Sequence, residues 1–231
     1  AKIRGIRSLA GHSETTDLTN DVNGGPSGIG IATSAGKAAF WDIVGAPDSL
    51  KIIAIEGEFA LTSGHSQELK TTALAQQVGK RLRILLSYNN AGIDDELIGG
   101  VVDSKYDAYR LEDQWASYGW NTLSIDDGND YDQVIAALKT MEDWDPNDHR
   151  PMIMIGNTIK GWWPASDNGK IPGYGDQIIS YHSHPYAFAM NDDYVQALAA
   201  TFEKHFGVKF VGMDKGPISN DKDRLIQFKQ N

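Results

Sequence analysis

The chain of 231 residues contains no cysteine. Without a thiol it cannot build a disulfide framework, a thiolate nucleophile or a cysteine-ligated zinc or iron–sulfur site. Any metal that it binds must therefore be held by oxygen or imidazole ligands. The sequence also lacks an apolar run of about 18 residues, which is the length that a membrane-spanning helix needs.

Basic residues are in short supply. The sequence has 21 lysines and arginines against 31 acidic residues, a formal net charge of -10. This balance argues against a nucleic-acid-binding protein or a protein of anionic membranes, because both neutralise phosphate with basic patches. The first residues, AKIRGIRSLAGHSE, lack the apolar core of a signal peptide. We therefore expect a cytoplasmic protein that binds neither nucleic acid nor membrane.

Apolar runs alternate with helical patterns along the chain. Such alternation is typical of an α/β protein with a doubly wound, mainly parallel sheet and helices on both faces. The run LRILLSY is apolar almost throughout, which indicates a central strand covered on both sides. The predicted strands are residues 51–55, 82–88, 122–125 and 151–155, and the predicted helices are residues 26–45, 66–78, 104–118 and 131–144.

The last part of the chain is harder to place in a sheet. A long irregular segment after Gly161 is rich in Trp, Gly, Pro and Tyr, and a further helix is predicted over residues 192–206. We expect one domain over residues 1–206, followed by a linker or docking tail over residues 207–231.

Polar residues follow two of the predicted strands directly. EGE (residues 56–58) ends the strand 51–55, and YNNAGID begins at the end of the strand 82–88. Open parallel sheets bind ligands beyond the carboxyl ends of their strands. Carboxylate, carboxamide and carbonyl oxygens suit Mg²⁺ or Ca²⁺, and such an ion would hold a diphosphate. The glycine-rich residues 24–28 open a helix, and their N–H groups favour phosphate or a close backbone approach.

These segments resemble a known family. GHSE, GGPSGIG, EGEF with Glu68 ten residues later, YNNAGID, YGWNTL with DDGNDYDQVIAAL, TIKGWW and SHP follow one another over residues 2–184. Their order and spacing are similar to the amino-terminal, thiamine-diphosphate-binding domain of transketolases. The resemblance implies transfer of a two-carbon ketol unit between sugar phosphates in the pentose phosphate pathway. It also implies thiamine diphosphate as cofactor, with Mg²⁺ or Ca²⁺ bridging the diphosphate.

The resemblance also assigns individual residues. It implies Glu58, Asn90 and the carbonyl of Gly92 as metal ligands, and His12 and His184 as catalytic residues. The cofactor-binding residues that it implies are Gly25, Ser27, Gly57, Glu58, Phe59, Asn90, Gly92 and His184.

Some positions depart from the family pattern. Glu58 replaces the shorter aspartate of a GDG motif, and Phe59 replaces its second glycine. Ser63 stands where the family has a glutamate, and Lys160 stands where an apolar residue is usual. These departures predict thinner polar support around the site.

A second, pyrimidine-binding domain that would complete such a site has no counterpart here. We expect it from a longer chain or a separate subunit, in a homo- or hetero-oligomer. A non-catalytic relative that serves as a structural or regulatory partner is the alternative. A different nucleotide-binding α/β protein is a third reading, against which stands the absence of GxGxxG and of a Walker lysine.

Each candidate residue also has a simpler interpretation. Glu58 could be a solvated turn acid or a charge at a helix start, and Asn90 could be a turn former. His12 could be a surface residue, and His184 could pair with His182 at a metal or lie in a polar loop. His65 and His149 are expected to be solvated, and the acidic run 126–130 is most simply a turn with a helix cap.

Overall fold

A computed structural model of the chain describes residues 28–75, 77–89, 91–92, 95–96, 111–162, 199–201, 203–204 and 207. The chain divides into two compact units, one made of Ala1–Asp21 with Lys160–Asn231 and the other of Val22–Ile159. The described strands and the helices α1 to α4 all lie in the second unit. In the first unit, residues 199–201 and 203–204 are helical, within the helix predicted over residues 192–206.

The second unit is built on a parallel sheet. Its strands are β1 (Ile52–Gly57), β2 (Leu82–Tyr88), β5 (Asn121–Ile125) and β6 (Met152–Asn157), in the order β1-β2-β6-β5. All three pairings are parallel, so the carboxyl ends of the strands share one edge. The four strands predicted from the sequence are therefore confirmed, with β2 in a central position.

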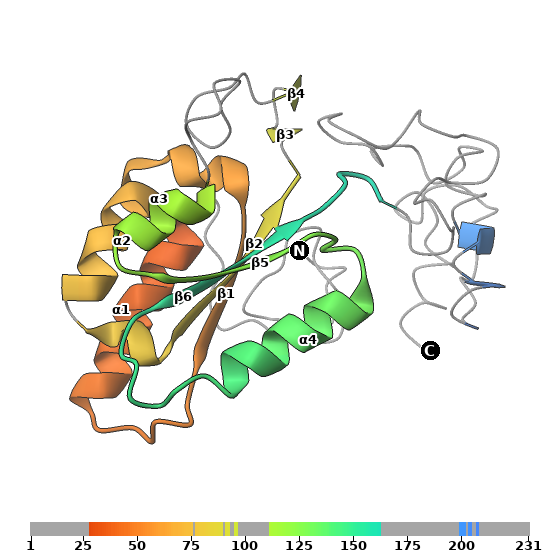
Figure 1. Cartoon of the computed structure of the whole chain (residues 1–231). Coiled ribbons are helices and arrows are strands. Elements are labelled where there is room, and N and C mark those ends of the chain that lie inside the picture. Colours follow the sequence, from red (N-terminus) through yellow and green to blue (C-terminus); the bar gives the residue numbers. More distant parts are fainter. Residues whose placement is uncertain are drawn as a thin grey trace, which may run out of the picture. The chain divides into compact units, whose positions relative to one another are not determined.

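Helices cover both faces of the sheet, as predicted (Figure 1). Helices α1 (Ile29–Ile43), α2 (Gly64–Ala75) and α3 (Leu111–Ser117) pack on one face, and α4 (Tyr131–Glu142) packs on the other. The larger core includes Ile31, Leu69, Trp115, Ile84 and Ile153, and the smaller one is formed by Ala137, Met141, Met152 and Met154. None of the helices in the described part is long and apolar enough to cross a membrane.

Short elements not predicted from the sequence lie at the ends of the strands. A 3₁₀ helix, η1 (Glu58–Thr62), follows β1 directly, and a second one, η2 (Val78–Lys80), precedes β2. A small antiparallel pair, β3 (Ala91–Gly92) with β4 (Asp95–Glu96), follows β2. The helix predicted from residue 104 is present as α3, while residues 104–110 lie outside the described part.

Strand β1 is less buried than its sequence, KIIAI, indicates. Ala54 is buried, but Ile53 is 59% exposed and Ile55 is 77% exposed. Alternate side chains of a strand point to opposite faces, and Ala54 points towards α1. Both isoleucines are exposed because β1 ends the described sheet and α4 covers only the β5 and β6 side of the second face.

A buried arginine at the start of β2 holds the loop between α1 and β1. Arg81 is 1% exposed and forms an ion pair with Asp42 at the end of α1. It also donates hydrogen bonds to the carbonyls of Pro47 (2.6 Å) and Leu50 (3.2 Å). These partners compensate for the desolvation of the guanidinium. A residue of a type that is usually exposed thus holds this end of the unit together.

A buried lysine lies between α2 and α3. Lys70 has no exposed surface, and its Nζ donates to Gln67 Oε1 at 2.9 Å. The ammonium also lies 5.1 Å from the ring centroid of Trp115 and 5.5 Å from that of Tyr118. Burial lowers the pKa of Lys70 from 10.5 to about 8. The charged form is therefore less favourable in the folded protein than in the unfolded chain.

This lowered pKa predicts how the stability of the protein depends on pH. Below about pH 8 Lys70 is charged in both states, so its desolvation penalty is fully present. Between about pH 8 and 10.5 the folded protein releases the proton first, and the contribution of Lys70 to stability rises by up to about 3 kcal/mol. We expect Lys70→Met to be more stable than the wild type at pH 7 and to lack this rise. Urea unfolding at several pH values measures both effects.

Lys139→Met, at an exposed position of α4, is the matched control and should keep the rise. Equal pH dependence of the wild type and Lys70→Met would contradict the assignment of the titration to Lys70.

Candidate functional site

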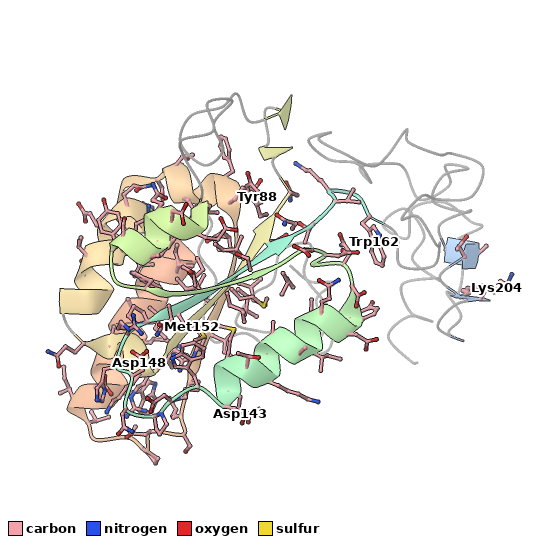
Figure 2. The ribbon with its side chains drawn as sticks, viewed as in Figure 1. Tyr88, Asp143, Asp148, Met152, Trp162 and Lys204 are labelled. Carbon is pink, nitrogen blue, oxygen red and sulfur yellow. The ribbon has the colours of Figure 1, made fainter. Side chains whose placement is uncertain are left out.

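The carboxyl ends of β1 and β2 lie side by side. Glu56 pairs with Leu86, and Gly57 pairs with Ser87. Figure 2 labels Tyr88 at this edge of the sheet and Met152 at the start of β6, at the opposite edge. The predicted adjacency of the two segments is therefore confirmed as far as Tyr88 and Asn89, while Asn90 lies outside the described residues.

Glu58 follows β1 directly at this edge of the sheet. It is the first residue of η1, is only 1% exposed, and its Oε2 accepts a hydrogen bond from the backbone N–H of Asn89 at 3.1 Å. A buried carboxylate costs several kcal/mol unless it is paired or hydrogen-bonded. Glu58 is thus not a solvated turn acid, because its carboxylate is buried and turned towards the end of the neighbouring strand. Its hydrogen-bond donor there, Asn89, directly precedes the predicted ligand Asn90.

Gly57, which precedes Glu58 in the chain, has open space at its Cα. Its backbone is extended, with φ -91° and ψ 153°, so any residue could adopt its conformation. Among the residues that the structure describes, none other than its two chain neighbours has an atom within 4 Å of a Cβ added at Gly57. The lack of a side chain therefore keeps the backbone accessible to a ligand. Phe59, the next predicted cofactor-binding residue, is 36% exposed.

Glu56, at the end of β1, links two glycine segments. Its Oε2 accepts a hydrogen bond from the N–H of Gly28 at 3.1 Å, and its Oε1 accepts one from the N–H of Gly57 at 3.2 Å. Gly28 is the residue immediately before α1. Its N–H therefore donates to a carboxylate of the protein, although the sequence predicts that the glycine-rich segment offers its N–H groups to phosphate. Sequence reasoning assigned no role to Glu56.

Gly28 is held tightly between α1 and the start of α2. It has a φ of +86°, which glycine adopts without strain, and an added Cβ would overlap the hydroxyls of Ser63 and Ser66. Both hydroxyls are 2.8 Å from the carbonyl oxygen of Ala60, to which they donate hydrogen bonds. Ser63, which replaces a glutamate of the family pattern, thus belongs to the packing of this turn.

Two predictions on ordinary surface roles are confirmed. Asp130 caps α4, because its carboxylate accepts hydrogen bonds from the N–H groups of Asp132 (2.8 Å) and Gln133 (3.1 Å). His65 and His149 are exposed.

Several predicted site residues lie outside the described part of the chain. They are His12, Gly25, Ser27, Asn90 and His184, together with His182. Gly92 is described as part of β3, where it pairs with Asp95. Lys160 belongs to the other compact unit. The assignments of these residues to cofactor, metal or catalysis stay predictions.

The donor set is compatible with a hard cation of the predicted kind. The described residues include no group of three or more His, Asp or Glu side chains that could hold a metal by themselves. The predicted set needs only one carboxylate, and Glu58 supplies it, buried at the strand edge. Oxygen ligands of this type suit Mg²⁺ or Ca²⁺.

Comparison with solved structures shows the same fold. A transketolase from Campylobacter jejuni matches with a TM-score of 0.60 and 20% identity, over 94% of this chain and 30% of that protein. A transketolase mutant from Pichia stipitis matches with a TM-score of 0.57 and 18% identity, over 95% of this chain and 30% of that protein.

Curated relatives are similar in sequence over part of their length. A transketolase from Halalkalibacterium halodurans is 26% identical over 91% of this chain and 31% of its own length. A 6-deoxy-6-sulfo-D-fructose transketolase subunit, SqwG, from a Clostridium species is 27% identical over 68% of this chain and 53% of its own length. The chain thus spans about a third to a half of these relatives.

A family model supplies the assignment. The model described as transketolase, thiamine diphosphate binding domain, matches residues 2–179, which is most of the chain. The order of motifs, the parallel sheet and the buried Glu58 at its carboxyl edge agree with this match. The chain therefore belongs to the transketolase family, as a thiamine-diphosphate-binding domain.

Proposed function

We propose that this chain binds thiamine diphosphate together with Mg²⁺ or Ca²⁺ and forms the diphosphate-binding part of a transketolase-type enzyme. The complete enzyme would transfer a two-carbon ketol unit between sugar phosphates, with thiamine diphosphate as the source of the nucleophilic carbon and the electron sink. The observation that carries the proposal is the buried Glu58 carboxylate, which lies between two strand ends beside the open backbone of Gly57.

The charge of Glu58 supports a cation at this edge. A diphosphate next to a buried carboxylate would be strongly unfavourable without a positive charge between them. Glu58, Asn90 and the carbonyl of Gly92 are the residues that we propose to hold that cation. Gly57 would allow the diphosphate to approach the backbone, and His12 and His184 would act on the substrate side.

The limited span of the chain supports a second component. The chain covers 31% of one transketolase and 53% of a relative that is itself named a subunit. We propose that a pyrimidine-binding domain, on a longer chain or a separate subunit, completes the site in a homo- or hetero-oligomer. As part of the same proposal, we place the enzyme in the cytoplasm and in the pentose phosphate pathway.

A non-catalytic relative is the second candidate. Two observations favour it: Ser63 replaces a glutamate of the family pattern, and the N–H of Gly28 already donates to Glu56. In that case the chain would keep the fold and would serve as a structural or regulatory partner.

Calorimetric titration separates the two candidates. Thiamine diphosphate should be added to the full chain with Mg²⁺, with Ca²⁺ and with EDTA, in the presence and absence of a pyrimidine-domain protein. We expect saturable binding that requires the cation and becomes tighter with the second domain. No binding under any of these conditions would favour the non-catalytic partner.

Glu58→Ala tests the metal ligand. Removal of a direct ligand should weaken cation-dependent binding by more than about a hundredfold, since loss of mere supporting groups already costs 10- to 100-fold. Glu58→Asp, which keeps a carboxylate and matches the family motif, should retain cation-dependent binding. Calorimetry measures the affinities, and circular dichroism checks the fold. Unchanged affinity in Glu58→Ala would show that the ligand assignment is wrong.

Gly57→Ala tests the approach of the diphosphate to the backbone. The extended conformation and the open space at residue 57 predict an unchanged unfolding temperature. The new methyl group would occupy the space that we assign to the ligand, so we expect affinity for thiamine diphosphate to fall at least tenfold. The control is Gly36→Ala. Gly36 lies on α1 and also has open space at its Cα, and this variant should leave the affinity unchanged. Equal affinities of Gly57→Ala and the wild type would place the ligand elsewhere.

A further inference from the structure

The Glu56 carboxylate joins two segments that are far apart in the sequence. One oxygen accepts a hydrogen bond from the N–H of Gly28, 28 residues earlier, and the other accepts one from the N–H of Gly57. Gly28 ends the glycine-rich segment, and Gly57 immediately precedes Glu58. Each oxygen of one carboxylate thus holds one of the two turns that are expected to meet the cofactor.

The face of β1 explains why Glu56 reaches α1. Ala54 packs in the core beside α1, and Glu56, two residues later, points to the same face. Helix α1 has no acidic residue in its first turn and no side-chain cap. The positive end of its dipole therefore favours a carboxylate supplied by the neighbouring strand.

The opposite side of Gly28 is equally well fixed. The hydroxyls of Ser63 and Ser66 lie against it and leave no space for a Cβ atom. Gly28 is thus enclosed by two serine hydroxyls on one side and bonded to Glu56 at its N–H. The bond to Glu56 fixes this glycine relative to β1, and the two serines fix it relative to the start of α2.

We propose that Glu56 is a positioning residue that sets the spacing between the glycine-rich segment and the Gly57–Glu58 turn. It does so as an acceptor for two backbone N–H groups, without contact to the cofactor. This inference rests on the proposed function, since the two turns are those to which we assign thiamine diphosphate and its cation. It also gives a role to the carboxylate that precedes the family's metal motif in this chain.

The opposite role makes the opposite prediction. If the Glu56 carboxylate merely occupied the start of α1 as a substitute for phosphate, diphosphate would have to displace it, and its removal would strengthen binding. If Glu56 positions the two turns, its removal weakens binding. The sign of the change in affinity therefore decides between the two roles.

The experiment compares Glu56→Ala, Glu56→Gln and the wild type with two measurements. The first is hydrogen exchange of the Gly28 amide by NMR in the cofactor-free full chain. We expect exchange to accelerate about tenfold in Glu56→Ala, because a hydrogen bond to a charged acceptor is lost. Glu56→Gln keeps one acceptor oxygen and should be intermediate. Unchanged exchange in Glu56→Ala would overturn the proposal.

The second measurement is the affinity for thiamine diphosphate with Mg²⁺, with the second domain added if the wild type requires it. We expect Glu56→Ala to bind about tenfold more weakly and Glu56→Gln to recover part of the loss. Glu142→Ala, an exposed carboxylate on α4, is the matched control and should bind like the wild type. Equal or tighter binding in Glu56→Ala would overturn the positioning role.

The two proposals fail in different ways. Absence of cofactor binding by the wild type would count against the proposed function and not against the contact itself. The exchange of the Gly28 amide would still decide whether Glu56 holds the glycine-rich segment.

Discussion

The parallel pairing of β1 with β2 is the constraint on which the rest of the site depends. It sets Gly57 opposite Ser87, so that Glu58 after β1 and Asn89 after β2 leave the sheet at the same edge. The Glu58 carboxylate then meets the N–H of Asn89, which compensates part of the cost of burying it. The hydrophobic cores on the two faces of the sheet hold this register.

The carboxylates of Glu56 and Glu58, which flank Gly57, lie in different surroundings. Glu56 turns towards the start of α1, where it accepts a hydrogen bond from the N–H of Gly28, and Glu58 turns towards the end of β2. Their like charges and that of a diphosphate would repel one another in a partly buried site. The dipole of α1 supplies positive potential near Glu56, and the divalent cation that we propose would supply it near Glu58.

The sequence was sufficient to predict the four strands of the sheet and to place Glu58 beside the end of β2. The apolar run LRILLSY and the alternation of strands and helices are patterns of residues close together in the sequence. They can therefore be recognised without coordinates. The exposure of Ile53 and Ile55 depends on which helices cover β1, and the role of Glu56 depends on a contact 28 residues away. The burial of Lys70 and Arg81 likewise depends on tertiary partners, because both residue types are normally exposed.

The alternation of side chains in β1 makes its length as important as its composition. A single residue inserted directly before Ile53 would turn Ile53 and Ile55 towards α1 and rotate Glu56 to the far face of the sheet, if the start of the strand kept its register. A point substitution in such a strand changes one side chain, whereas a change of length moves all the side chains beyond it to the opposite face. In the evolution of this domain, the residue types of β1 should therefore vary more than its length.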